Sequence, residues 1–235
     1  MAVSDLHGNL DGLDPSGCDV VAVAGDFSKM YGFGYWHVYS QTGWIKKKFF
    51  DFVSSYPDVQ FVVTPGNHDL SFDSRYNPNG WRADLRNCPS NLRFLVDSGV
   101  EILGLKFWGT PWVPPISGVW AFEADDEKQK LAFSIIPNGV DVLISHSPPR
   151  IPDRELDVSD FGTTKSRPFG SWMLADAVSE KKPRYMFCGH IHTGDHAPAE
   201  FAGSTIYNVS RLDEQYEVRY EPLILDVQLA AEDSI

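Results

Sequence analysis

The chain has 235 residues, of which 43% are hydrophobic and 13% aromatic, enough for one sizeable core. Its formal net charge of -12 argues against dedicated nucleic-acid binding, because such proteins neutralise phosphates with many Lys and Arg side chains. No apolar run approaches the roughly 18 residues that span a bilayer, and the first residues do not resemble a signal sequence. We therefore expect a single domain over residues 1–235, cytoplasmic and without a membrane partner.

Three apolar strands are expected in the first third of the chain. The first covers residues 1–4 and is short, the second covers residues 20–24, and the third covers residues 60–64. The second run shows no alternation of apolar and polar residues, which is typical of a strand buried on both faces of a parallel sheet.

One amphipathic helix is expected between the second and third strands. Apolar residues recur at helical spacing between residues 45 and 53, and Pro57 ends the pattern. The run Lys46–Lys48 lies between them, and we interpret it as a solvated face rather than an anion site. Residues 32–44 are rich in Gly and aromatic side chains and give no clear prediction.

The middle of the chain predicts strands, a proline-rich loop and a helix. Residues 92–108 are expected to form an antiparallel meander, because short apolar runs alternate with turn dipeptides. The tryptophans of residues 109–115 and Trp120 could line a substrate cleft, but we interpret them as packing residues. A helix is predicted over residues 122–136, since its first acidic residues complement the helix dipole and Pro137 ends it.

The last part of the chain predicts further strands around one long loop. Strands are expected over residues 140–145, 184–188, 205–209 and 216–227, and a helix over residues 171–180. The loop of residues 150–170 is polar, and loops of this length often bind ligands. We select Arg150 and Arg154 in this loop as candidate substrate-phosphate contacts.

Five of the strands lead directly into side chains that can bind a metal ion. These side chains are Asp5 and His7, Asp26, Asn67 and His68, His146, and His190 and His192. Taken alone, residues 66–69 (Gly-Asn-His-Asp) could be a simple turn, because Gly and Asn favour turns and Asp caps helices. Sites in parallel α/β sheets form beyond the carboxyl ends of the strands, so we expect the five loops to converge on one metal site.

The expected ligands are imidazoles, carboxylates and one amide oxygen, without a thiolate. This chemistry suits Mn, Fe or Zn rather than calcium, and the affinity order of the metals does not choose among them. Seven residues can supply eight contacts to two ions if Asp26, a single carboxylate after a central strand, bridges them. Two such ions can hold a hydroxide between them and clamp the attacking and leaving oxygens. The two carboxylates neutralise only part of the charge of two divalent ions, so the site stays positive, which favours an anionic substrate.

The motifs resemble, in the same order, those of the calcineurin-like metallophosphoesterase superfamily. They are Asp-x-His (residues 5–7), Gly-Asp (25–26), Gly-Asn-His-Asp (66–69), His146 and Gly-His-x-His (189–192). The resemblance implies an α/β fold, a four-layer α/β/β/α sandwich of two mixed β-sheets flanked by helices. It places the active site at the carboxyl ends of the strands.

The resemblance also implies a role for each residue of these motifs. One metal would be held by Asp5, His7, Asp26 and His192, and the other by Asp26, Asn67, His146 and His190. His68 would be the acid that protonates the leaving oxygen, and Asp69 would orient His68. Manganese is the metal that we expect to support activity.

Further segments resemble the metallophosphoesterase-domain-containing branch of the superfamily, whose members are metal-dependent phosphodiesterases. These segments are residues 24–27, 109–112, 120–122, 146–149 and 207–209. His192, which some members of the branch lack, is retained. The Ser/Thr protein phosphatases continue after Gly-Asp with Asp-Arg-Gly, whereas this chain continues with Phe27-Ser28-Lys29.

Three functions follow as hypotheses from these residues and this resemblance. The first is a metal-dependent phosphodiesterase that hydrolyses a small phosphodiester, such as a cyclic nucleotide or another nucleotide. The alternative is a phosphomonoesterase acting on a small metabolite or a phosphoprotein. The third is a metal-binding scaffold without turnover, whose mark would be a missing ligand or acid, and none is missing here.

Overall fold

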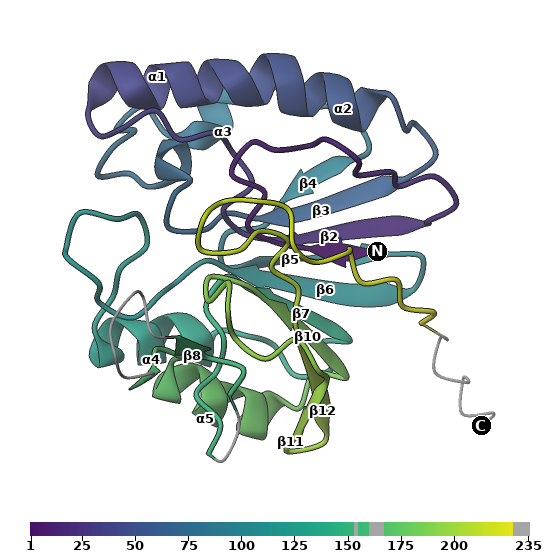
Figure 1. Cartoon of the computed structure of the whole chain (residues 1–235), viewed down its shortest axis with the longest axis vertical. Coiled ribbons are helices and arrows are strands. Elements are labelled where there is room, and N and C mark those ends of the chain that lie inside the picture. The colour runs from purple at the N-terminus through teal and green to yellow at the C-terminus, as the bar shows by residue number, and fades with distance from the viewer. Residues whose placement is uncertain (153–154, 160–166, 228–235) are drawn as a thin grey trace.

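The computed structural model describes residues 1–152, 155–159 and 167–227 of the chain. These residues form two β-sheets that lie face to face, and helices cover the outer face of each sheet (Figure 1). The layers therefore follow the order helix, sheet, sheet, helix, and the expected α/β/β/α sandwich is confirmed.

The first sheet contains four parallel strands in the order β1-β2-β3-β4. Their bounds are Ala2–Val3, Val20–Ala24, Gln60–Thr64 and Leu92–Phe94. The apolar runs of β2 and β3 lie side by side in the middle of this sheet, which explains their lack of polar alternation. An isolated antiparallel bridge joins Ala2 at the edge of the sheet to Leu223.

The second sheet contains six strands in the order β11-β12-β10-β7-β6-β5. In that order their bounds are Ala199–Phe201, Ser204–Asn208, Tyr185–Cys188, Val142–Ser145, Leu105–Thr110 and Ser98–Ile102. The four central strands are parallel, and β11 and β5 are antiparallel edge strands, so this sheet is mixed. A separate antiparallel pair, β8 (Val158–Ser159) and β9 (Arg167–Pro168), lies within the predicted long loop.

Helices pack on both outer faces of the sandwich (Figure 1). The first sheet is covered by α1 (Tyr35–Trp44), a π-helical segment (Ile45–Phe49) and α2 (Phe50–Ser54), and the second by α4 (Asp126–Ser134) and α5 (Trp172–Lys181). Two short helices are the 3-10 turn Leu70–Phe72 and α3 (Trp81–Asp84). Within the described ranges, no helix combines the length and apolar content needed to traverse a bilayer.

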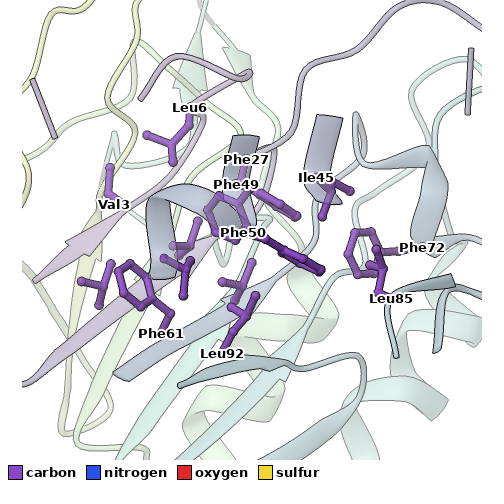
Figure 2. Close-up of a cluster of buried hydrophobic side chains, with 14 of the residues drawn as sticks. Val3, Leu6, Phe27, Ile45, Phe49, Phe50, Phe61, Phe72, Leu85 and Leu92 are labelled. Carbon is purple, nitrogen blue, oxygen red and sulfur yellow. The ribbon is translucent and has the colours of Figure 1, made fainter. Parts of the chain in front are cut away.

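Each interface between layers has its own apolar cluster. Figure 2 shows part of the cluster between the N-terminal helices and the first sheet, where Phe27 and Phe49 are buried with ring centroids 4.7 Å apart. Leu143 and Leu174 pack between the second sheet and its helices, and Phe187 packs between the two sheets. Cores on both faces of each sheet hold the strand ends in place, and the functional side chains lie at those ends.

Two predicted elements begin at different residues in the structure. The helix over the first sheet begins at Tyr35 rather than near residue 45. The prediction missed this first part because Gln41 and Thr42, on its buried side, interrupt the apolar pattern. The helix predicted from residue 122 begins at Asp126, and Asp125 caps it by accepting a hydrogen bond from the backbone N–H of Lys128.

Two further predictions of strand arrangement were wrong. β4 does not belong to a meander with β5 and β6, because it pairs parallel with β3 in the other sheet. Residues 216–227 do not form a strand, since their only described pairings are isolated bridges from Val218 to Leu212 and from Leu223 to Ala2. Both errors concern pairing partners, which local sequence patterns do not determine.

Candidate metal centre

The loops predicted to carry metal ligands meet at one edge of the sandwich, beyond the carboxyl ends of five strands. Three groups of donor atoms lie within 4.8 Å of one another: Asp5 with His7 and His192, His7 with Asp26 and His68, and Asp5 with Asp26 and His146. We call these donor groups together the ligand cluster. Strands from both sheets contribute to it, so it joins the two halves of the fold.

The carboxylate of Asp26, which follows β2, lies at the centre of the cluster. Its Oδ2 atom is 3.3 Å from Nε2 of His146 and 3.9 Å from Nε2 of both His7 and His68. Its Oδ1 atom accepts a 2.7 Å hydrogen bond from the backbone N–H of His68. The carboxylate of Asp26 therefore lies close to donor atoms from both sheets.

Asp5, which follows β1, organises the other side of the cluster. Its Oδ1 atom is 3.3 Å from Nε2 of His192, and its Oδ2 atom accepts a 2.8 Å hydrogen bond from Oγ of Ser210. The backbone N–H of His190 also donates to Oδ2 of Asp5, at 3.0 Å. These bonds leave the Asp5 carboxylate beside His192 and fully buried.

Two of the histidines have their ring orientation set by backbone carbonyls. Nδ1 of His146 lies 2.9 Å from the carbonyl oxygen of Ala24, and Nδ1 of His192 lies 2.9 Å from that of Asp213. A carbonyl oxygen only accepts hydrogen bonds, so Nδ1 carries the proton in both rings. Nε2 of each neutral ring is therefore the atom that would offer its lone pair to a metal ion.

Glycines allow the ligand-bearing loops to approach one another closely. A Cβ atom on Gly25 would lie 2.2 Å from Nδ1 of His146, and one on Gly66 would lie 2.3 Å from Oδ1 of Asp26. Neither position has room for a side chain, because ordinary Cβ contacts are much longer. The glycines before Asp26 and Asn67 are thus required by packing between loops.

Four of the predicted ligands adopt the left-handed backbone conformation that L-residues rarely use. Their φ angles are 54° for Asp5, 44° for His7, 50° for Asp26 and 70° for His190. Each such residue costs roughly 1 kcal/mol or more, and such residues concentrate at functional sites. The packing of the surrounding sandwich offsets this cost and holds these four side chains at the cluster.

Protons on two imidazoles balance the buried carboxylates. Burial opposes protonation of His146, but the Asp26 carboxylate outweighs it and raises the pKa of His146 to about 9. Burial likewise opposes protonation of His192, and Asp5 raises its pKa to about 9. Burial alone would raise the pKa values of Asp5 and Asp26, but these imidazoles hold both well below their ordinary value.

The remaining donors fit a metal cation. Burial lowers the pKa of His7 to about 4, and burial together with His146 lowers that of His190 to about 3, so both rings are neutral at pH 7. Nε2 of His7 is buried and has no hydrogen-bond partner among the described residues. An unsatisfied buried polar atom costs about 1–3 kcal/mol, which a metal ion at this atom would remove. Imidazole and carboxylate donors without thiolate suit Mn, Fe or Zn.

Asn67 and His68 follow β3 and point into the cluster in different ways. Oδ1 of Asn67 lies 2.9 Å from Nε2 of His146, so the amide oxygen is among the buried donors. The ring of His68 is stacked against Trp120, with ring centroids 4.4 Å apart. Because His68 also belongs to one of the close donor groups, both proton transfer and metal binding are geometrically open to it.

Asp69 is buried behind the loop that carries Asn67 and His68. Its buried carboxylate accepts hydrogen bonds from the backbone N–H groups of Gly66 at 2.7 Å and Ser28 at 3.0 Å. Burial and the nearby charge of Asp26 raise the pKa of Asp69 to about 7. The hydrogen bonds of Asp69 fasten the β2 and β3 loops to each other on either side of His68, and a role of Asp69 in orienting the His68 ring stays a prediction.

A cavity of about 600 Å³ lies beside the ligand cluster. Its lining includes the predicted ligands Asp26 and His190 and the apolar side chains of Pro114, Ile116 and Phe169. Arg150 also lines this cavity, and its guanidinium carbon lies 4.8 Å from the ring centroid of Trp172. The second predicted substrate contact, Arg154, lies outside the described residues.

Two residues near the site were missed by sequence reasoning. Nε2 of Gln41 in α1 donates a 2.8 Å hydrogen bond to the carbonyl oxygen of His68, but its segment gave no helical pattern. Tyr216 meets the ring of His7 edge to face at 4.7 Å, although its segment was predicted to be a strand. The polar run Asp213-Glu214-Gln215 was the available sequence signal for a turn, because Asp side chains often bond to the backbone two residues on. In the structure Asp213 accepts such a hydrogen bond from the backbone N–H of Gln215.

Comparisons with known proteins agree with this geometry. Residues 1–194 match the family model described as calcineurin-like phosphoesterase. The chain is 30% identical over 247 residues to metallophosphoesterase domain-containing protein 1 of Homo sapiens and of Mus musculus, covering 97% of this chain and 70% of each relative.

A solved structure has the same fold. The crystal structure of the Thermus thermophilus protein TT1561 has a TM-score of 0.61 at 13% identity and covers 94% of this chain and 96% of its own. The family model spans the strands and loops that build the ligand cluster. The chain therefore belongs to the calcineurin-like phosphoesterase family, whose members are metal-dependent phosphoester hydrolases.

Proposed function

We propose that this protein is a phosphodiesterase that hydrolyses a small phosphodiester, such as a cyclic nucleotide or another nucleotide. The observation that carries the proposal is the composition of the cavity lining, in which Arg150 and Glu214 accompany the apolar side chains of Pro114, Ile116 and Phe169. A diester carries one negative charge and two organic groups. One guanidinium can pair with that single charge, and the apolar walls can contact both organic groups.

The ligand cluster is proposed to hold two ions. One would be bound by Asp5, His7, Asp26 and His192, and the other by Asp26, Asn67, His146 and His190. Ions bound at this place would supply a nucleophile at neutral pH and neutralise the charge that develops on the phosphate. Manganese, iron and zinc all suit the donors, and manganese is proposed for activity.

His68 is the proposed general acid for the departing alkoxide. Its side chain is 16% exposed and lines the cavity, so substrate can reach it. Burial lowers the pKa of His68, and the charge of an anionic substrate would favour its protonated form. An imidazolium at this position can then donate its proton to the leaving oxygen.

The proposal is tested by comparing two substrates with manganese-loaded protein. A higher kcat/KM for bis-p-nitrophenyl phosphate than for p-nitrophenyl phosphate is expected. The reverse preference would favour a phosphomonoesterase acting on a small metabolite or a phosphoprotein. If elemental analysis shows bound metal but a broad phosphoester panel gives no turnover, a non-catalytic metal-binding scaffold would be favoured instead.

A further inference from the structure

The ring of His68 is held between two other rings. The indole of Trp120 is stacked on it with centroids 4.4 Å apart and planes inclined by 29°. The ring of His7 meets it at 4.7 Å and 88° on another side. In this orientation Nε2 of His68 lies 3.9 Å from Oδ2 of Asp26.

Trp120 lies in the loop between β6 and α4, and one carboxylate organises this loop. Oε2 of Glu123 accepts hydrogen bonds from the backbone N–H groups of Ile116, Ser117 and Gly118, at 2.9, 3.1 and 2.7 Å. Its Oε1 atom accepts a 2.8 Å bond from the N–H of Trp120 itself. Several N–H groups converging on one anion form a defined loop conformation. Glu123 thereby determines where the Trp120 backbone lies.

A second set of bonds fastens the loop on the other side of Trp120. Nη2 of Arg75 donates to the carbonyl oxygen of Trp120 and forms a 2.9 Å ion pair with Asp73. Oδ2 of Asp73 also accepts a 2.9 Å hydrogen bond from the N–H of Phe122. These residues lie outside the three close donor groups, so their bonds hold the indole without taking part in ligand binding.

We infer that Trp120 is a positioning residue for His68 and that Glu123 acts through Trp120. The inference rests on the proposed function, because it takes His68 as the proton donor. An imidazole on a turn can rotate about its side-chain bonds, and misplacement of a catalytic group by about 1 Å can cost on the order of a hundredfold in rate. The indole face removes most of these rotations before substrate binds.

The experiment compares aryl phosphodiesters of similar shape whose leaving groups differ in basicity, from p-nitrophenol to unsubstituted phenol. For Trp120→Ala we expect kcat to fall about tenfold or more with the phenol ester and less than about threefold with the p-nitrophenol ester. KM should change little. Trp120→Phe should recover most of the lost kcat. Glu123→Gln should lower kcat more for the phenol ester than for the p-nitrophenol ester, by a smaller factor than Trp120→Ala. Trp36→Ala, at a side chain that is 74% exposed, is the matched control.

His68→Ala, measured in parallel, separates this inference from the proposed function. Equal losses for both esters in His68→Ala would remove the acid role and the inference with it. If His68→Ala is selective for the leaving group while Trp120→Ala is not, or if Trp120→Ala changes only KM, the positioning role is overturned and the proposed function stands.

A readout that does not depend on turnover completes the test. The indole face should shift the ring proton resonances of His68 upfield, and Trp120→Ala should remove this shift while metal content is retained. An unchanged His68 spectrum would overturn the inference. Thermal unfolding reports whether each variant is folded. If Trp120→Ala does not fold, the same comparisons are made with Trp120→Phe and Glu123→Gln.

Discussion

Substitution of Gly66 by Ala tests whether the close approach of the β2 and β3 loops is required for the metal centre. The added Cβ would lie 2.3 Å from Oδ1 and 2.5 Å from the backbone nitrogen of Asp26, and 2.8 Å from Cδ2 of His146. The backbone nitrogen cannot rotate away as a side-chain end can. One loop must therefore move by about 1 Å, since ordinary contacts to a Cβ begin near 3.4 Å.

The expected magnitude follows from this overlap. Overpacking at a close-packed position costs about 1–3 kcal/mol of the free energy of unfolding. For a chain of this size that cost corresponds to a fall in melting temperature of about 2–12 °C. Movement of Asp26 would also weaken metal binding, because its carboxylate is proposed to contact both ions.

The assay measures thermal unfolding of chelator-treated protein and a manganese titration of Gly66→Ala beside wild type. Gly43→Ala is the matched control, because a Cβ on Gly43 in α1 would meet nothing within 4 Å. We expect this control to bind manganese normally and to be stabilised by about 0.5–1 kcal/mol, as for Gly to Ala in a helix. A Gly66→Ala protein with wild-type melting temperature and wild-type manganese affinity would refute the steric reasoning.

Three further predictions concern the ligands and the cavity. Asp26→Ala should abolish metal binding and turnover together, and retention of two ions by elemental analysis would contradict its bridging role. Because the pKa values of His146 and His192 are raised to about 9, both rings are protonated below that pH and must lose their protons to bind metal. Metal affinity should therefore rise as pH increases from 7 to 9. Calorimetry in buffers of different ionisation enthalpy should detect the protons released on metal binding. Equal affinities at pH 7 and 9 would disprove this coupling. Arg150→Ala should raise KM for the diester about tenfold with a smaller change in kcat, and an unchanged KM would remove Arg150 from substrate binding.

The meeting of the candidate donor side chains at one edge of the sandwich could be predicted from the sequence, because each of them follows a local pattern. An apolar run followed at once by Asp, Asn or His places that side chain at the end of a strand, and parallel strands bring such ends together. Asp26 after β2 and His146 after β7 illustrate the rule, since their side chains meet at 3.3 Å although they come from different sheets. The apolar runs by themselves predicted parallel strands buried on both faces, and the four-layer order was implied by the resemblance of the motifs to the calcineurin-like metallophosphoesterases.

Only the tertiary structure determined the contacts between segments that are distant in the sequence and share no local pattern. The sequence of β4 is compatible with either sheet, and its pairing with β3 places it in the first. Asp69 follows His68 directly, yet its carboxylate bonds to the N–H of Ser28 in another loop. The backbone of Trp120, whose ring stacks on His68, donates a hydrogen bond to Glu123 and accepts one from Arg75. Periodicity and strand exits are properties of one segment, whereas these contacts depend on how separate segments pack, and that is determined only when the whole core forms.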